Sequence, residues 1–297
     1  MQKGTMKVPF LVLWSVILAM FTAVLSAAPL RVVRTTVGQG LFWVIGLALS
    51  AAFFVIHFYA LAFVLGAQVI LIGAFSEFEE RGLTLRHSAT LSVFVASLAS
   101  ASGFFLWSAF ERKNLFQVFS GWIGEFLKRA TEMKIPIFEG LKPEVLVYQL
   151  PSALVIFLIL SLALSLMLER PISRWAGIFP QCKAKLSEYT NPDFFIWILI
   201  LSLLGTFLNS AARPVQEVSL NVLNISILAY FFQGLGVMGT YFEIFQVGFL
   251  WRLMWVLILV IQLPIVLSAV GVVDYWLEFR RFFMKKAAQL KNKRVQE

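Results

Sequence analysis

Residues 220–243 read LNVLNISILAYFFQGLGVMGTYFE, a stretch with the apolar bulk of a membrane-spanning helix. Five hydrogen-bonding side chains interrupt it at depths where a span meets no water: Asn221, Asn224, Ser226, Tyr230 and Gln233. At about 100° per residue, Asn221 and Asn224 share one helix face, and the other three share the opposite face. Because a helix that is polar on two sides is costly to expose to lipid, we expect it inside a helix bundle.

Two interpretations of these polar side chains are open. Asn and Gln that bond across helices stabilise a membrane bundle by about 0.6–2 kcal/mol each, which is the simpler role. Alternatively, one stripe lines a pocket for a small polar molecule, because intramembrane polar groups often mark a site. The candidate ligand-binding residues are Asn221, Asn224, Tyr230 and Gln233.

The whole chain has the same membrane character. Of its 297 residues 60% are apolar and 14% are charged, whereas a soluble domain is about 45–50% apolar and about 25% charged. Stretches of about 18 or more apolar residues recur, each long enough to cross the hydrocarbon core. These features predict an all-α fold, a polytopic membrane helix bundle.

We expect about eight spans within a bundle of residues 1–273. Their boundaries are about 8–28, 37–56, 58–75, 88–110, 151–168, 194–209, 220–239 and 249–273. The second and third come from one apolar run that is too long for a single helix, so a turn is expected near His57 and Tyr59. One tilted span with a re-entrant piece is the alternative, which leaves seven spans. The first span imitates a secretory signal, but its length predicts that it is not cleaved.

Lys and Arg residues in the connections predict the orientation. With eight spans and a cytoplasmic N-terminus, sixteen of them lie inside and nine outside, and the seven-span alternative gives the same split. We therefore expect a multi-pass protein of the bacterial inner (cytoplasmic) membrane with both termini in the cytoplasm.

Two segments outside the spans are amphipathic or basic. Segment 111–149 is expected on the cytoplasmic side, and its part 111–130 carries aromatic residues on one helix face, typical of an interfacial helix. Docking into a partner's groove needs the same pattern. Residues 274–297 predict a basic cytoplasmic C-terminal helix that contacts anionic headgroups of the lipid bilayer. No nucleic acid is expected as a partner, because no recognition fold accompanies the charges.

Little in the sequence supports enzymatic chemistry. The acidic run Glu77, Glu79 and Glu80 is expected in a solvated loop, the alternative being a metal or acid–base site. The single cysteine, Cys182, and the two histidines lack zinc-ligand spacing. We therefore expect no enzyme, no cofactor and no metal. The chain contains no ATPase, so active transport would need a separate motor.

Two further features have two interpretations each. Ala19, Ala23 and Ala27 recur at intervals of four in the first span, where small residues let helix backbones approach closely. They serve packing within this bundle or docking against a partner membrane subunit. Asp274 either caps the start of the C-terminal helix or forms an ion pair with Arg280 or Arg281.

The last third of the chain carries a recognisable pattern. Asn221, Asn224, Tyr230, Gln233 and Gly234 precede a proline-containing span that exits through VGVVDYWLEFRR, residues 270–281. This pattern resembles the YybS-like family of uncharacterised bacterial inner-membrane proteins, which is distantly similar to the S components of energy-coupling factor transporters. The resemblance implies about eight helices and a solute site within the bundle. It also implies docking of a coupling subunit, which works with a separate ATPase, through Ala19, Ala23 and Ala27.

Two functions are therefore expected. The leading one is binding or transport of a small polar solute in the manner of an S component. The alternative is a structural or assembly protein of the membrane that acts through partner proteins, with the polar span as bundle glue.

Overall fold

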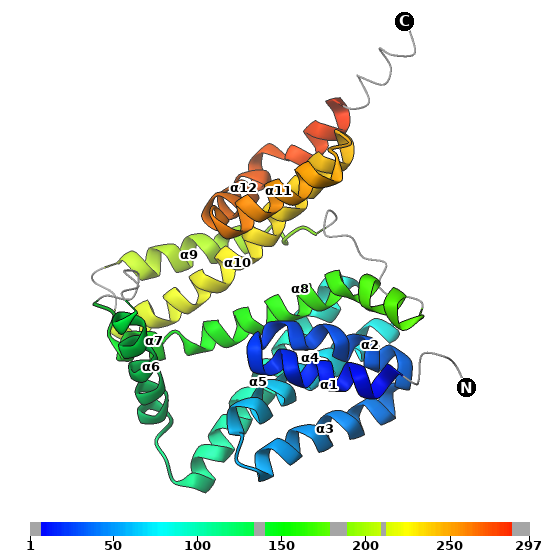
Figure 1. Cartoon of the computed structure of the whole chain (residues 1–297). Helices are drawn as coiled ribbons and strands as arrows, with labels where there is room; N and C mark the ends of the chain where they lie inside the picture. Colours follow the sequence, from blue (N-terminus) through cyan, green and yellow to red (C-terminus); the bar gives the residue numbers. More distant parts are fainter. Residues whose placement is uncertain (1–6, 134–139, 179–188, 209–211, 287–297) are drawn as a thin grey trace, which may run out of the picture. The chain divides into compact units, whose positions relative to one another are not determined.

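The computed structural model describes residues 7–133, 140–178, 189–208 and 212–286 (Figure 1). Every regular element within these ranges is a helix, so the predicted all-α fold is confirmed. The chain divides into two compact units, Met1–Lys183 and Ala184–Glu297.

The first unit contains α1 (Val8–Phe21), the 3-10 helix η2 (Val24–Ser26), α2 (Ala27–Val37), α3 (Gln39–Val55), α4 (Tyr59–Glu80), α5 (Leu85–Glu111), α6 (Leu115–Glu132), α7 (Pro143–Val147) and α8 (Leu150–Ala176). The second unit contains α9 (Phe195–Phe207), α10 (Arg213–Ile244), α11 (Phe249–Ile261) and α12 (Pro264–Leu277), and residues 279–286 are also helical.

Four of the described helices are long and apolar enough to cross a membrane: α4, α5, α8 and α10. The bent pair α11 and α12 adds a fifth candidate if it counts as one span. The shorter apolar helices α1, α3 and α9 have 14, 17 and 13 residues. The expected count of about eight spans is therefore not confirmed.

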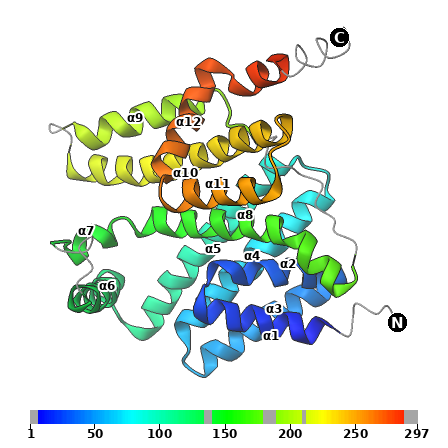
Figure 2. The same ribbon diagram turned by 45° about the horizontal axis from the view of Figure 1, so that its top comes forward.

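The prediction of one continuous first span is wrong, because the chain turns back within it. α1 ends at Phe21, Ala23 adopts a φ of 43°, and η2 leads into α2. At about 1.5 Å per residue, neither α1 nor α2 is long enough to cross the hydrocarbon core. The two helices pack against each other, as Figure 2 shows.

α2 lies in the interior of the first unit. All of its residues from Ala27 to Arg34 are buried, and it packs against α1, α4 and α8. A helix within a membrane protein can carry charge at modest cost only when protein encloses it. The enclosure of α2 therefore explains how Arg31 and Arg34 lie among apolar helices.

The predicted turn near His57 is confirmed. α3 ends at Val55 and α4 begins at Tyr59. His57 has a φ of 64°, a left-handed conformation that reverses the chain between the two helices. The long apolar run is therefore two helices, and whether α3 spans the membrane or re-enters it stays a prediction.

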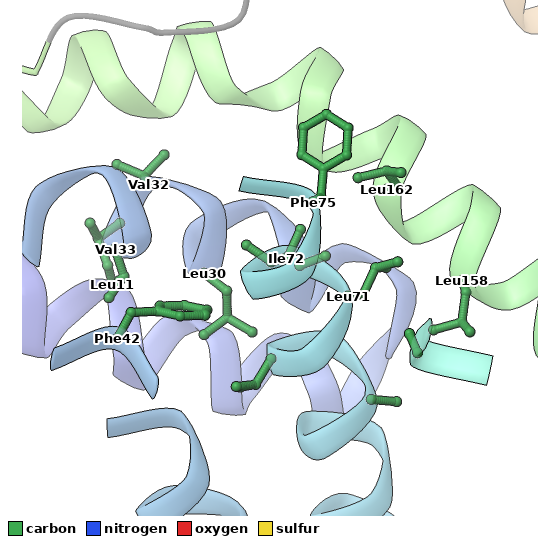
Figure 3. Close-up of a cluster of buried hydrophobic side chains, with 14 of the residues drawn as sticks. Leu11, Leu30, Val32, Val33, Phe42, Leu71, Ile72, Phe75, Leu158 and Leu162 are labelled. Atoms are coloured by element: carbon green, nitrogen blue, oxygen red, sulfur yellow. The ribbon is translucent and has the colours of Figure 1, made fainter. Parts of the chain in front are cut away.

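One cluster of buried apolar side chains joins six helices of the first unit, namely α1 to α5 and α8 (Figure 3). Its members include Leu11 on α1, Leu30 on α2, Phe42 on α3, Ile72 and Phe75 on α4, and Leu158 on α8. Since lipid tails are as apolar as these side chains, the gain in such a cluster comes from close van der Waals packing rather than from exclusion of water.

In the second unit, α10 and α12 approach closely at two glycines. A Cβ atom on Gly234 would overlap the carbonyl oxygen of Leu267, and a Cβ atom on Gly271 would overlap that of Tyr230. Backbones this close are the arrangement that small residues allow at helix interfaces in membranes. The two glycines therefore fix where α12 crosses α10.

The predicted amphipathic helix after residue 111 is present as α6. The side chain of Asn114 caps its start by accepting a hydrogen bond from the Phe116 backbone N–H at 2.9 Å. Trp122 on α6 faces Trp107 of α5, with ring centroids 6.2 Å apart. Its position at the membrane interface stays a prediction.

Candidate functional site

The four predicted ligand-binding residues all lie on α10, but not on one surface. Tyr230 and Gln233 are buried, whereas Asn221 and Asn224 are half-buried. The amide nitrogen of Asn221 donates to the carbonyl oxygen of Glu217 in its own helix, at 2.8 Å. The structure thus brings Tyr230 and Gln233 together on one face and places the two asparagines apart from them.

Gln233 is the centre of a polar cluster formed by Tyr189, Asn191, Gln233, Asp274 and Arg280, the Gln233 cluster. The amide nitrogen of Gln233 donates to Oδ2 of Asp274 at 3.2 Å, and its amide oxygen accepts from the backbone N–H of Asn191 at 3.2 Å. The Arg280 guanidinium donates to the backbone carbonyls of Tyr189 and Gln233, at 2.7 and 3.1 Å. Three separate parts of the unit therefore meet at one amide side chain.

Asp274 corrects one interpretation of the sequence. α12 continues through Asp274 to Leu277, so Asp274 does not cap the helix that follows. Its Oδ2 lies 3.8 Å from Nε of Arg280, which confirms the alternative, an ion pair with Arg280. Arg281 pairs instead with Glu278 at 2.7 Å.

Gln233 and Asp274 of the Gln233 cluster are buried, the other three residues are half-buried, and the cluster is incompletely satisfied. Burial lowers the pKa of the Arg280 guanidinium, and the charge of Asp274 opposes this shift. Within the described residues, Oδ1 of Asp274 and the amide nitrogen of Asn191 are buried without a hydrogen-bond partner. An unmade hydrogen bond of this kind costs about 1–3 kcal/mol. The cluster thus keeps one carboxylate acceptor and one amide donor without a partner in the described part of the chain.

A cavity of about 280 Å³ adjoins the Gln233 cluster. It is lined by Val237, Met238, Tyr241, Val270, Phe279 and Phe283. Val237 lies one helical turn after Gln233, Val270 one turn before Asp274, and Phe279 directly before Arg280. None of the four predicted ligand-binding residues is among these lining residues. The walls of the cavity are apolar, and the Gln233 cluster lies about one helical turn away along α10 and α12.

A second polar cluster, in the first unit, was missed by the sequence analysis. The Arg31 guanidinium is 0% exposed and donates to Glu169 at 3.2 Å, to Ser76 at 2.8 Å and to Glu79. We call these four residues the Arg31 cluster. Glu169 on α8 is also 0% exposed. The cluster joins α2, α4 and α8 by charge-assisted hydrogen bonds, which are the strong ones.

The placement of the acidic run in a solvated loop is therefore wrong. Glu77, Glu79 and Glu80 form the last turn of α4. The indole N–H of Trp43 donates to Glu77 at 2.7 Å, and Arg34 donates to Glu80 at 2.9 Å. The acidic residues tie α4 to α2 and α3.

Only one signal in the sequence points to the Arg31 cluster. Ser161, Ser165, Glu169 and Ser173 recur every fourth residue on α8, and all four are buried. The amide nitrogen of Gln68 donates to Ser161 at 2.7 Å, which extends the polar contact between α4 and α8. Such a stripe indicates a helix face that meets protein, but it does not identify Arg31 as the partner.

The three predicted docking alanines do not share one helix face. Ala19 lies on α1, Ala23 lies in the turn, and Ala27 begins α2. Ala19 and Ala27 are buried within the first unit. Docking of a coupling subunit at this turn stays a prediction.

This chain has several apolar helices of membrane-crossing length, and charged and amide side chains pair between its helices within each unit. These features define a polytopic integral membrane protein. The chain belongs to the family described as predicted membrane protein (DUF2232), whose model matches residues 8–275. Comparison with curated proteins and with solved structures finds no significant match. Membership in an uncharacterised membrane-protein family is thus confirmed, and the similarity to S components stays a prediction.

Proposed function

We propose that this protein binds a small polar solute within its second unit, as a non-enzymatic multi-pass protein of the bacterial inner membrane with cytoplasmic termini. The proposal rests on the cavity together with the Gln233 cluster one helical turn away, in which Asp274 and Asn191 have buried hydrogen-bonding atoms without a partner among the described residues. An apolar pocket with a few convergent polar groups is the usual form of a small-molecule site.

The chemistry of the cavity defines the solute. Oδ1 of Asp274 accepts a hydrogen bond and the amide of Asn191 donates one, so the solute carries both a donor and an acceptor on one edge. The remaining walls are apolar, which favours a compact apolar body behind that edge. A volume of about 280 Å³ suits a metabolite-sized molecule.

Transport in the manner of an S component requires partners. We propose a membrane coupling subunit with a separate ATPase, docked at the hairpin of α1 and α2 that carries Ala19, Ala23 and Ala27. Anionic lipid headgroups hold the basic C-terminal segment at the cytoplasmic surface.

The first test is native mass spectrometry of protein extracted gently from its own membranes. A small molecule should co-purify with the wild type and be lost from Met238→Trp, which fills the cavity. Val218→Trp is the matched control, because Val218 is exposed on the same helix and should retain the molecule. Asp274→Asn keeps the shape of the side chain and should weaken retention. A wild-type protein that carries only lipids refutes the proposal.

An assembly protein is the second candidate, and α6 favours it. Phe116, Trp122 and Phe126 on α6 leave much of their ring surface exposed. If this face serves partner proteins, charge reversal at Lys285 and Lys286 together with Trp122→Ala abolishes cellular function. Asp274→Asn then changes stability alone.

A further inference from the structure

The first unit contains a groove of about 470 Å³, whereas the proposed solute site belongs to the second unit. Its lining comes from the end of α1, the turn between α3 and α4, the start of α4, and α6. The lining residues are Ala19, Met20, His57, Phe58, Tyr59, Ala60, Leu61, Val64 and Trp122. We call it the His57 groove. Most of its lining residues are apolar, and His57, Tyr59 and Trp122 carry the polar side-chain atoms among them.

The rim of the His57 groove carries a chain of polar contacts. Nδ1 of His57 lies 2.6 Å from the Tyr59 hydroxyl, which donates to Glu111 at 3.3 Å. Lys113 pairs with the same carboxylate at 3.1 Å and stands 5.8 Å from the centroid of the Trp107 ring. The charges of Glu111 and Lys113 are thus matched within the rim.

Arg112, next to the rim in sequence, adds an exposed positive charge. It lies between Glu111 and Lys113 at the end of α5, is exposed, and makes no ion pair within the described part of the chain. The rim is therefore complementary to an anion that carries one negative charge.

The groove lies at the ends of two membrane-length helices. α4 begins at Tyr59 and α5 ends at Glu111, and both are long and apolar enough to span. Tyr59, Trp107 and Trp122 gather there, with Tyr59 and Trp107 centroids 5.7 Å apart. Aromatic and basic side chains at span ends are typical of the headgroup level of a bilayer.

We propose that the His57 groove binds one phospholipid. One acyl chain of the phospholipid lies along Met20, Leu61 and Val64, and the phosphate of the lipid faces Arg112 at the rim. An apolar floor below an aromatic and cationic rim matches the order of chain and phosphate in a membrane leaflet. Phospholipids surround any membrane protein at high concentration, so one of them can occupy the groove even if its affinity is low.

The test uses delipidated full-length protein and phosphatidylglycerol with a photoactivatable acyl chain. Cross-links should fall on peptides that contain residues 57–64 or Trp122. Ala60→Trp fills the groove from an exposed position and should abolish these cross-links. Ala51→Trp, exposed on α3 outside the groove, should leave them intact. Cross-links spread evenly over the apolar surface, or equal results for the two variants, overturn the proposal.

Recognition of the phosphate is tested separately by native mass spectrometry. Arg112→Gln should lower the occupancy of phosphatidylglycerol about fivefold and leave that of a diacylglycerol with the same chains unchanged. Arg86→Gln, an exposed change at the other end of α5, is the control and should alter neither. Equal loss of both lipids, or no loss, overturns the role of Arg112.

Discussion

Replacing Arg31 with methionine should destabilise the first unit by about 3 kcal/mol or more. The variant removes a fully buried guanidinium that bonds to Glu169, Ser76 and Glu79. Removal of one partner from a buried ion pair costs about 3–5 kcal/mol. Ser76 still donates to the carbonyl of Ile72 at 2.8 Å, and the Glu79 side chain is 32% exposed and can be hydrated. Most of the cost therefore falls on Glu169, which has no exposed surface.

A matched control separates burial from charge. Arg129 pairs with Glu125 at 2.9 Å one helical turn away, and the two side chains are 68% and 64% exposed. Exposed pairs of this kind contribute about 0.3–0.5 kcal/mol, so Arg129→Met should change stability very little. The assay is unfolding of the purified protein in mixed detergent micelles, followed by tryptophan fluorescence as the denaturing detergent is increased.

A second variant tests the cause of the loss. Arg31→Met combined with Glu169→Met removes both buried charges, and replacement of a whole buried ion pair by apolar residues is often close to neutral. The double variant should therefore be more stable than Arg31→Met alone. A loss below about 1 kcal/mol for Arg31→Met, or simple addition of the two single effects, would refute this reasoning.

Two smaller predictions use the same assay. Gly271→Ala should lower the free energy of unfolding by about 1–3 kcal/mol, because its Cβ would overlap the carbonyl of Tyr230. Gly121→Ala on α6, with open space around it, should be neutral or stabilising. Equal effects of the two variants would contradict the close crossing of α10 and α12. Ala23→Gly should not destabilise the protein, because glycine accepts the φ of 43° at lower cost than alanine; a loss above about 1 kcal/mol would show that the turn has another conformation.

Hydropathy predicts the helical class and most helix centres of this chain, but not where helices break or which charges are buried. The third predicted span ends at residue 75, yet α4 continues to Glu80, because its acidic residues find partners on α2 and α3. Those partners are more than thirty residues away in the sequence. A hydropathy average over neighbouring residues does not include such distant partners, so the acidic run resembles a solvated loop in the sequence.

The same limit affects the orientation count. The count includes Arg31 and Arg34 as residues of the connection between the first two expected spans, on the external side, whereas both are buried on α2. A positive charge that protein encloses carries no information on sidedness, because the charge bias operates through residues in short connections.

The candidate site was partly predictable. Gln233 stands out as an amide within an apolar run, and the pair Asp274 and Arg280 was one of two alternatives. Tyr189 and Asn191 were not predictable, since their contacts with Arg280 and Gln233 are made by backbone groups that every residue has. The apolar cavity one turn away was also hidden, because its lining has the same composition as the lipid-facing surface.

The distance in sequence between Arg31 and Glu169 has a consequence for biosynthesis. The two residues are 138 positions apart, so the ribosome completes α8 long after α2 has left the exit tunnel. At about 5–20 residues per second, this delay lasts about 7–28 s. During that time α2, with two arginines, has no carboxylate from α8 to receive it and does not partition into lipid on its own. The N-terminal hairpin should therefore enter the membrane late, and either the insertion machinery or the membrane surface holds it until then.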